Sequence, residues 1–451
     1  MARLTRRHAG RNNLPNAAGA MAVGRPAPGT GGAGRAPPRI LLVDADAFFV
    51  AVARMEDPDG AGRAELLIVG GAPGSRGVVC SASYAARAYG VRSAMPISRA
   101  MRLCPQAMCV PVPRGVCSRK SREIARVLGR YSPVVEGASI DEWYVDMSGT
   151  EALYHHETLD VTARRMRQAV LRETGLPVSI GGGTNRLIAK LAVEYAKPRP
   201  TTGADGVLCV AAGEELQFMS RVTLAEIPGI GPRFRERLER AGFVRVSDII
   251  PASIDELVRR FGEREGHWLY ERARGIASAR VTSVDRPKSV SREETFDRDV
   301  AEDDEIEREL LRLVTRVASD LRAKELATST ISVKLRDRDF KTRRASKTID
   351  QAVIGDRVIL EVSRELLHKL RAARRIPARL LGVGLSSLVP SDEPVQIPLF
   401  EPAASEGETS RDRTIAATLD RVREKYGSQA LVPGRLARSS APSTVEEDEI
   451  A

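Results

Sequence analysis

Cysteine is scarce in this chain, and its arrangement excludes two common ways of stabilising a small domain. The 451 residues include five cysteines, an odd number, and no two of them form a CxxC pair. A disulfide framework needs paired cysteines and a zinc site needs closely spaced ligands, so neither is indicated. The scarcity fits a reducing compartment, and we expect a cytoplasmic protein.

Long apolar runs are also missing. A membrane helix needs about 20 consecutive apolar residues, and no stretch of the sequence approaches that length. The basic N-terminus has no apolar segment after its charges, so it does not resemble a secretory signal. We therefore expect no membrane partner.

Acidic residues are outnumbered by basic ones. Lys and Arg total 70 against 59 Asp and Glu, which gives a formal net charge of +11. This excess favours an anionic polymer as partner, and nucleic acid is the commonest one. A generically basic soluble protein has the same composition, so charge alone leaves both interpretations open. A chain of this length predicts several domains.

The order of the predicted elements divides the chain. Residues 1–38 are rich in Gly, Ala, Pro and Arg and contain no acid, which predicts a disordered basic arm that either binds phosphates weakly or is inert. Strands then alternate with helices as in an α/β domain, a wholly helical stretch follows, and a small α+β domain precedes a polar tail. The expected strands are 40–43, 66–69, two within 134–147, 178–180, 331–336 and 379–386, and the expected helices include 160–174, 185–195, 301–324, 355–373 and 412–425.

Three carboxylates stand at the ends of apolar strands. Asp44 follows the run 40–43, and Asp141 and Glu142 lie inside the apolar segment 138–145. Buried carboxylates are costly unless they are paired or bind metal, and two-metal phosphoryl transfer needs such oxygen ligands. Each acid alone is more often a solvated turn residue. Neighbours in a regular strand also point to opposite faces, so Asp141 and Glu142 share a site only if the strand turns or breaks there.

The surrounding sequence is more specific. Four segments, in order along about residues 39–400, resemble the motifs of the Y family of translesion DNA polymerases. They are Val43-Asp44-Ala45-Asp46-Ala47-Phe48-Phe49, the fingers segment 77–96, Ser139-Ile140-Asp141-Glu142, and the palm-helix segment from Ala189-Lys190-Leu191 to Ala196-Lys197-Pro198.

The resemblance implies a multidomain α/β and α+β fold arranged as a right-hand polymerase. The expected parts are palm and fingers at 39–220 (fingers about 50–110), a helical thumb at 221–285, a linker at 286–290, a little finger at 291–388 and a tail at 389–451. It also implies a monomer that acts on primer-template DNA and deoxynucleoside triphosphates.

The resemblance also implies the residues of the active site. Asp44, Asp141 and Glu142 would hold two Mg²⁺ ions, and the backbone carbonyl of Ala45 would add a ligand. Phe49 would collide with a ribose 2′-hydroxyl. The residues expected to grip the incoming triphosphate are Ser81, Tyr84, Arg87 and Lys197. From the residues alone, Tyr84 could equally be a core aromatic, and the two cations could lie on a solvated face.

Two departures from the family pattern are visible. Ser83 stands where the family commonly has Asn, so one supporting hydrogen bond is expected to differ. Trp143 and Tyr144 follow the acids where a small residue and then an aromatic are more usual, which bears on local packing.

Two segments are candidates for gripping DNA. The run 227–232 resembles a helix-hairpin-helix, in which Gly229 and Gly231 would let backbone N–H groups reach a phosphate; a structural helical turn is the alternative. A basic hairpin in the small α+β domain would follow duplex phosphates without reading bases; an ordinary sheet edge protected by charge is the alternative. Its candidate DNA-binding residues are Lys334, Arg336, Arg343 and Arg344.

The tail contains Gln396-Ile397-Pro398-Leu399-Phe400, which resembles the bacterial sliding-clamp binding motif. Gln396, Leu399 and Phe400 would fill the clamp pocket, though so short a motif also occurs by chance.

The sequence as a whole predicts a translesion DNA polymerase without proofreading. Two alternatives are a catalytically inactive polymerase-like adaptor, which would be expected to lose the acids, and a helix-hairpin-helix repair nuclease or glycosylase, which would not need Tyr84, Arg87 and Lys197 in family order.

Overall fold

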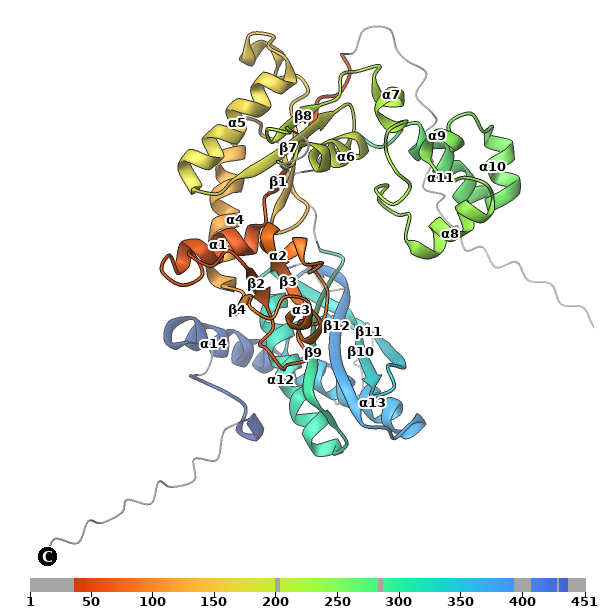
Figure 1. Cartoon of the computed structure of the whole chain (residues 1–451). Coiled ribbons are helices and arrows are strands. Elements are labelled where there is room, and N and C mark those ends of the chain that lie inside the picture. Colours follow the sequence, from red (N-terminus) through yellow and green to blue (C-terminus); the bar gives the residue numbers. More distant parts are fainter. Residues whose placement is uncertain (1–35, 199–202, 283–286, 393–406, 428–429, 437–451) are drawn as a thin grey trace, which may run out of the picture.

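The computed structural model describes residues 36–198, 203–282, 287–392, 407–427 and 430–436. Figure 1 shows the described chain as a palm, fingers, a helical thumb and a fourth domain below them. Within these ranges, no helix is both long enough and apolar enough to cross a membrane.

The palm is built on a five-stranded sheet with the order β5-β6-β1-β7-β8. β1 lies in the centre and pairs antiparallel with both β6 and β7. Both of its neighbours are far away in sequence: β6 lies about 100 residues after β1, and β7 lies more than 130 residues after it. The strands are β1 (Ile40–Ala45), β5 (Val135–Gly137), β6 (Glu142–Asp146), β7 (Val178–Gly183) and β8 (Val207–Cys209).

Helices cover both faces of this sheet, which explains why β1 is a continuous apolar run. Leu41 and Val43 pack into the core formed with α4 (Arg114–Leu128) and α5 (Leu159–Thr174). Ile40 and Leu42 point to the opposite face, where Ala189 and Val193 of α6 (Arg186–Ala196) meet them. The expected α/β domain is confirmed. Two short helices, η1 (Glu151–Tyr154) and α7 (Glu215–Met219), lie in the connections.

The fingers form a small three-stranded sheet with the order β3-β2-β4. Its core consists of small and medium side chains, among them Ile68, Val79 and Ala86. The elements are α1 (Phe48–Glu56), β2 (Leu67–Gly70), β3 (Val79–Ala82), α2 (Tyr84–Ala88), α3 (Ile97–Leu103) and β4 (Met108–Val110).

The thumb is helical, as expected. Its core is formed by Leu238, Ile249, Leu257 and Leu269, one from each helix. The helices are α8 (Pro232–Arg240), α9 (Val246–Ile249), α10 (Ile254–Phe261) and α11 (Glu263–Ala273).

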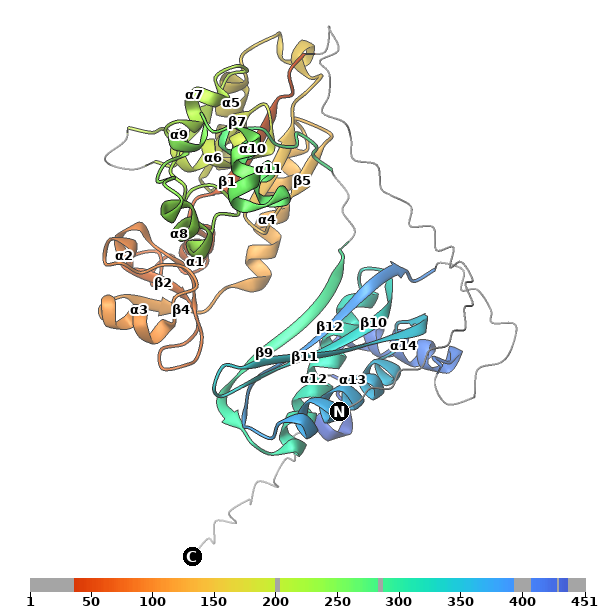
Figure 2. The same cartoon turned by 90° about the vertical axis from the view of Figure 1, so that its right-hand side faces the viewer.

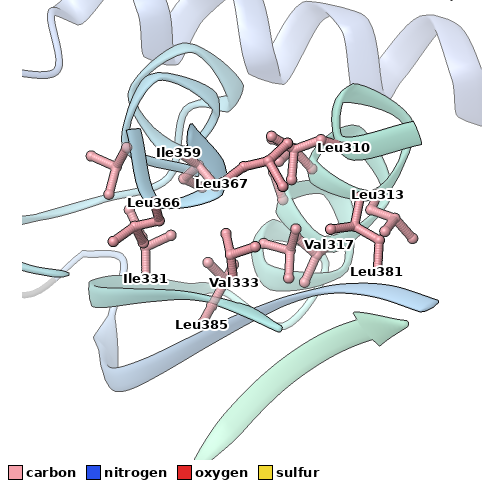
Figure 3. Close-up of a cluster of buried hydrophobic side chains, with 14 of the residues drawn as sticks. Leu310, Leu313, Val317, Ile331, Val333, Ile359, Leu366, Leu367, Leu381 and Leu385 are labelled. Carbon is pink, nitrogen blue, oxygen red and sulfur yellow. The ribbon is translucent and has the colours of Figure 1, made fainter. Parts of the chain in front are cut away.

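The little finger is a four-stranded antiparallel sheet with the order β11-β10-β12-β9. Two helices cover one face, and Figure 3 shows Leu310 and Leu367 of these helices packed above Val333 and Leu385 of the strands. In Figure 2 the helices lie on the side of the sheet that points away from the palm. The elements are β9 (Ser289–Val300), α12 (Asp303–Arg322), β10 (Leu326–Asp337), β11 (Thr342–Val353), α13 (Asp356–Ala373) and β12 (Ala378–Pro390).

Strand β9 was not expected, and it begins inside the predicted linker 286–290. Its sequence is mostly polar for two reasons. One of its faces is open, and it lies at the edge of the sheet, where it pairs with β12. Strand β12 likewise runs to Pro390, two residues past the expected end of the little finger at 388.

The predicted tail helix exists as α14 (Ser410–Tyr426), followed by η2 (Gly434–Leu436). Asp420 of α14 lies 2.6 Å from Arg322, a guanidinium that also lies 2.7 Å from Asp356 of α13. Arg357 and Asp412 form a second ion pair at 2.9 Å. This part of the tail is therefore docked on the helices of the little finger.

Candidate active site

Two of the acids predicted to bind metal lie opposite one another in the palm. Asp44 stands near the end of β1 and Glu142 begins β6, and the antiparallel register pairs these two residues directly. Residues opposed in this way place their side chains on the same face of a sheet. Two carboxylates therefore share one side of the palm.

Asp141 lies just before β6, in a bend rather than in the regular strand. Its backbone N–H donates to the Ser139 hydroxyl at 3.2 Å, and that hydroxyl in turn donates to the Asp141 carboxylate. The Asp141 carbonyl accepts from the backbone N–H of Ala45 at 2.9 Å. The alternation of a regular strand starts only at Glu142, so it does not force the two acids to opposite faces.

Two lysines at α6 form ion pairs with Asp44 and Glu142. The Lys197 ammonium lies 3.1 Å from Asp44 and 2.7 Å from Glu194. Lys190, about two helical turns earlier on the same side of α6, pairs with Glu142. The positive charges thus come from the helix that covers the Asp44 side of the sheet.

Lys197 does not fully offset the burial of Asp44. Burial raises the pKa of Asp44 to about 7, and the charge of Glu142 adds to the rise while Lys197 opposes it. Burial by itself would lower the pKa of Lys197, but Asp44 and Glu194 outweigh it and raise that pKa above its usual value. A buried carboxylate of this kind is stabilised by an additional cation.

The donor chemistry fits a hard divalent cation, because carboxylate and carbonyl oxygens are the ligands such ions prefer. In the described part of the chain, however, no three His, Cys, Asp or Glu side chains are close enough together to hold a metal ion. Two of the acids are turned to lysines instead. Metal binding would therefore have to rearrange these ion pairs.

A glycine lets α6 approach the acids. A Cβ on Gly181 of β7 would lie 2.2 Å from the backbone nitrogen of Val193 and 2.3 Å from the carbonyl oxygen of Ala189. Only glycine permits a helix to pack this closely on a strand. The helix is fixed at its start by Asn185, whose side chain accepts from the backbone N–H of Leu187 at 3.0 Å.

Another acid of the first motif, Asp46, has a structural partner. It is buried and accepts a hydrogen bond from the Ser179 hydroxyl at 2.8 Å. The bond connects the end of β1 to β7.

The fingers contribute an aromatic ring that senses the charges of the palm acids, with a guanidinium beside that ring. The guanidinium carbon of Arg87 lies 5.0 Å from the centre of the half-exposed Tyr84 ring. Burial raises the pKa of Tyr84, and the charges of Asp46 and Asp44 add to the rise while Arg87 and Lys197 oppose it. Residues of the fingers and the palm thus act on one another electrostatically across the site.

Two neighbouring serines in the fingers are buried. Ser83 accepts a hydrogen bond from the backbone N–H of Ala86 at 3.2 Å and so caps α2, which gives this departure from the family pattern a structural use. Ser81 lies in β3 with only 5% of its surface exposed.

Phe49 stands in the first turn of α1, five residues after Asp44. The residue before the helix, Ala47, has φ 45° and ψ 45°, a left-handed conformation that is strained for a residue with a Cβ. The turn buries Phe48 and leaves Phe49 half-buried. Their rings lie 5.6 Å apart.

The bulky residues after Asp141 and Glu142 lie on separate faces of the sheet. Trp143 is 3% exposed in the core with α4 and α5, and Tyr144 is 8% exposed on the α6 side. The Arg186 guanidinium lies 4.0 Å from the Tyr144 ring centre and also pairs with Glu136.

In the thumb, the expected phosphate-binding turn precedes α8. Gly229 has φ 103° and leaves no room for a side chain, because a Cβ there would lie 2.8 Å from the Trp268 ring. Gly231 is the N-cap of α8, and no side chain caps this helix. The helix begins with Pro232, which has no N–H, so the N–H groups of Arg233 and Phe234 are the ones available to an anion.

The four basic residues of the little finger do not share one face. Across β10 and β11, Lys334 stands directly opposite Arg344, whereas Arg343 stands opposite the buried Leu335. Arg343 accordingly lies on the helix-covered face and forms a 2.9 Å ion pair with the fully buried Asp337. Its assignment to the DNA-binding face is corrected on this ground. Lys334 lies 2.7 Å from Glu293 on β9, and Arg336 donates to Thr342 at 2.8 Å.

A shallow hollow of about 280 Å³ lies on the open face between β9, β12, β10 and β11. Gly382 and Gly384 of β12 form its floor, since they carry no side chains above the sheet. Lys334 and Arg344 line it. The predicted clamp-binding residues Gln396, Leu399 and Phe400, and most of the N-terminal arm, lie outside the described residues.

Lys190 is the site residue to which the sequence motif gave no role. The signal that could have found it is its spacing from Lys197, because two lysines seven residues apart lie on the same side of a helix.

Three protein families match the chain in the order of its domains. The impB/mucB/samB family matches residues 43–194, the DNA polymerase-iota thumb domain matches 225–277, and the impB/mucB/samB C-terminal domain matches 287–399.

Curated relatives and solved structures agree with these families. A DNA polymerase IV of Desulfatibacillum aliphaticivorans is 34% identical over 403 residues, which cover 89% of this chain and 98% of the relative. A DNA polymerase IV of Streptomyces coelicolor is 37% identical over 373 residues, covering 82% of this chain and 75% of the relative. A Y-family polymerase chimera of Dbh and Dpo4 superposes with a TM-score of 0.67 at 25% identity, covering 78% of this chain and 99% of the chimera. The insertion ternary complex of Dbh DNA polymerase gives a TM-score of 0.55, also at 25% identity, with 77% and 98% covered.

The palm, fingers, thumb and little finger around paired carboxylates define a right-hand polymerase. The chain belongs to the Y family of DNA polymerases, among its DinB-like members. It is a DNA-directed DNA polymerase of the translesion type, and its chemistry depends on a divalent metal.

Proposed function

We propose that the chain adds deoxynucleotides to a primer end with two Mg²⁺ ions held by Asp44, Asp141, Glu142 and the carbonyl of Ala45. The observation that carries this assignment is the direct pairing of Asp44 with Glu142 across β1 and β6, beside the bend that contains Asp141. When bound, the ions stabilise charge on the attacking and leaving oxygens.

The protein groups position the nucleotide. Ser81, Tyr84, Arg87 and Lys197 hold the triphosphate. Lys197 suits the task because its ammonium group lies 3.1 Å from Asp44, at the edge of the proposed metal site. Phe49 stands where a ribose 2′-hydroxyl would fall.

The DNA is gripped from two sides in this proposal. At the thumb, the N–H groups after Gly231 bind a backbone phosphate. Gly229 allows the backbone to come close to it. The open face of the little finger follows the duplex through Lys334, Arg336 and Arg344. Neither contact reads a base, which suits an enzyme that works at many sequences.

Primer extension on a template with a single lesion tests the proposal. We expect extension opposite the lesion and the undamaged base in Mg²⁺, and none after removal of the metal with EDTA. A catalytically inactive adaptor would bind the primer-template and extend neither, so binding without extension would favour that alternative.

The segment 396–400 is proposed to bind the sliding clamp, which would raise the local concentration of a monomeric polymerase at the primer end. Replacing Gln396, Leu399 and Phe400 with alanine should abolish clamp binding and clamp-stimulated extension, and should spare extension without clamp. Surface plasmon resonance measures the affinity. Equal clamp affinity of variant and parent would exclude this segment as the tether.

A further inference from the structure

The metal site contains two lysines that match its two opposed acids. Lys190 lies within α6 and Lys197 directly follows that helix, seven residues later. Seven residues are about two helical turns, so both side chains lie on one side of α6. Lys190 pairs with Glu142 and Lys197 with Asp44, and these acids are direct partners across β1 and β6.

The two lysines differ in what else they contact. Lys197 donates to both Asp44 and Glu194, so it keeps a partner if Asp44 turns to a metal. Within the described residues, Lys190 and Glu142 form an ion pair only with each other, and their side chains are 29% and 24% exposed. Lys190 would lose this partner if Glu142 turned to a metal.

The Lys190–Glu142 ion pair offsets a repulsion between Asp44 and Glu142 in the metal-free protein. Like charges placed directly opposite on neighbouring strands repel one another and destabilise the sheet. A divalent cation would remove that repulsion, and without one the charge must come from the protein. Lys190 supplies it for Glu142.

We propose that Lys190 is a positioning residue that stands in for the metal, holding Glu142 in the metal-free enzyme and competing with the divalent cation for that carboxylate. This inference rests on the proposed function, because it takes Glu142 to be a metal ligand. Lys190 thereby stabilises the metal-free palm and weakens metal binding.

Thermal unfolding of the full chain, without DNA or nucleotide, tests the first half of the proposal. In EDTA, Lys190→Gln should lower Tm by about 2–4 °C, the effect of one partly exposed ion pair in a domain of this size. On addition of Mn²⁺, used as a paramagnetic cation of the same charge as Mg²⁺, its Tm should rise more than that of the parent and close the difference. Lys190→Arg should behave as the parent.

Mn²⁺ affinity tests the second half directly, with free Mn²⁺ measured by electron paramagnetic resonance. Lys190→Gln should bind Mn²⁺ about fivefold more tightly than the parent. The matched control is Lys120→Gln, which removes a 2.9 Å ion pair with Glu123 on α4 of similar exposure. It should lower Tm equally with and without Mn²⁺ and leave the affinity unchanged.

The outcomes separate this inference from the proposed function. If Mn²⁺ binds the parent and Lys190→Gln shows an unchanged affinity, or loses equal stability with and without Mn²⁺, the stand-in role is wrong and the metal site stands. If Glu142→Gln binds Mn²⁺ as tightly as the parent, the assignment of Glu142 as a ligand is itself wrong.

Discussion

The palm and the little finger are both built on antiparallel strands, yet they place charge in opposite ways. In the palm, helices cover both faces of the sheet, and the acids at the strand ends face lysines on a helix. In the little finger, helices cover one face, and basic residues stand on the strands of the other. We therefore expect catalysis in the palm to depend on single side chains at fixed places, and DNA binding on the open face of the little finger to depend on the sum of its charges.

Removal of the palm acids is the strongest test of this contrast. Asp141→Ala combined with Glu142→Ala should reduce primer extension below detection, because no other oxygen ligand replaces them, and should leave primer-template affinity largely intact. The same dipeptide, Asp255-Glu256, occurs on α10 of the thumb. Its replacement by alanines should leave extension near the parental rate, and an active palm variant would disprove the metal assignment.

Phe49 gives a smaller effect in the same region. Phe49→Ala should raise ribonucleotide relative to deoxynucleotide incorporation by about tenfold or more, since pocket clashes of this kind are worth roughly 1–3 kcal/mol. Single-nucleotide incorporation kinetics measure the ratio. Phe49→Leu, which keeps more bulk, should retain most of the discrimination, and an unchanged ratio in the alanine variant would remove Phe49 from this role.

On the little finger, substitutions should act through charge rather than identity. Arg336→Ala with Arg344→Ala should weaken DNA binding similarly for all sequences and lower the slope of log K against log salt by about 2. Replacing both with lysine should restore most of the affinity. A loss confined to particular sequences would show base readout and break the contrast with the palm.

Arg343 and Arg344 lie on opposite faces of β11, and replacing Arg343 should have the smallest effect on DNA binding. Arg343→Ala should lower the stability of the little finger by about 1–3 kcal/mol, because it removes one of two arginines that neutralise the buried Asp337. DNA affinity should change little, in contrast to Arg344→Ala. Thermal unfolding and salt-dependent DNA binding separate the two, and a DNA defect in a stably folded Arg343 variant would return this residue to the binding face.

Sequence patterns predicted those parts of the fold that local physics determines. The apolar run before Asp44 is buried on both faces, and the strand expected at 331–336 is the centre of β10. Strand β9 was missed because its open face and edge position leave it mostly polar. The site motifs named the acids but not Lys190, whose role depends on how closely α6 packs on Gly181.

The misplacement of Arg343 has a physical reason. Neighbouring residues of a strand point to opposite faces, but which of them points outward depends on the register between β10 and β11. That register is set by the whole hairpin and its packing. A cluster of basic residues in the sequence therefore cannot by itself define a basic surface.

The docking of α14 has a consequence for how the chain responds to cleavage. The described chain of the little finger runs to Asp392 and begins again at Gly407, where Glu408 accepts the backbone N–H of Ile354 at 2.9 Å. Asp412 and Asp420 then attach the helix to Arg357 and Arg322. A single proteolytic cut after Asp392 and before Gly407 would divide the polypeptide, but the two fragments would stay bound to each other. The C-terminal fragment would copurify with the polymerase until salt or acid disrupted its ion pairs.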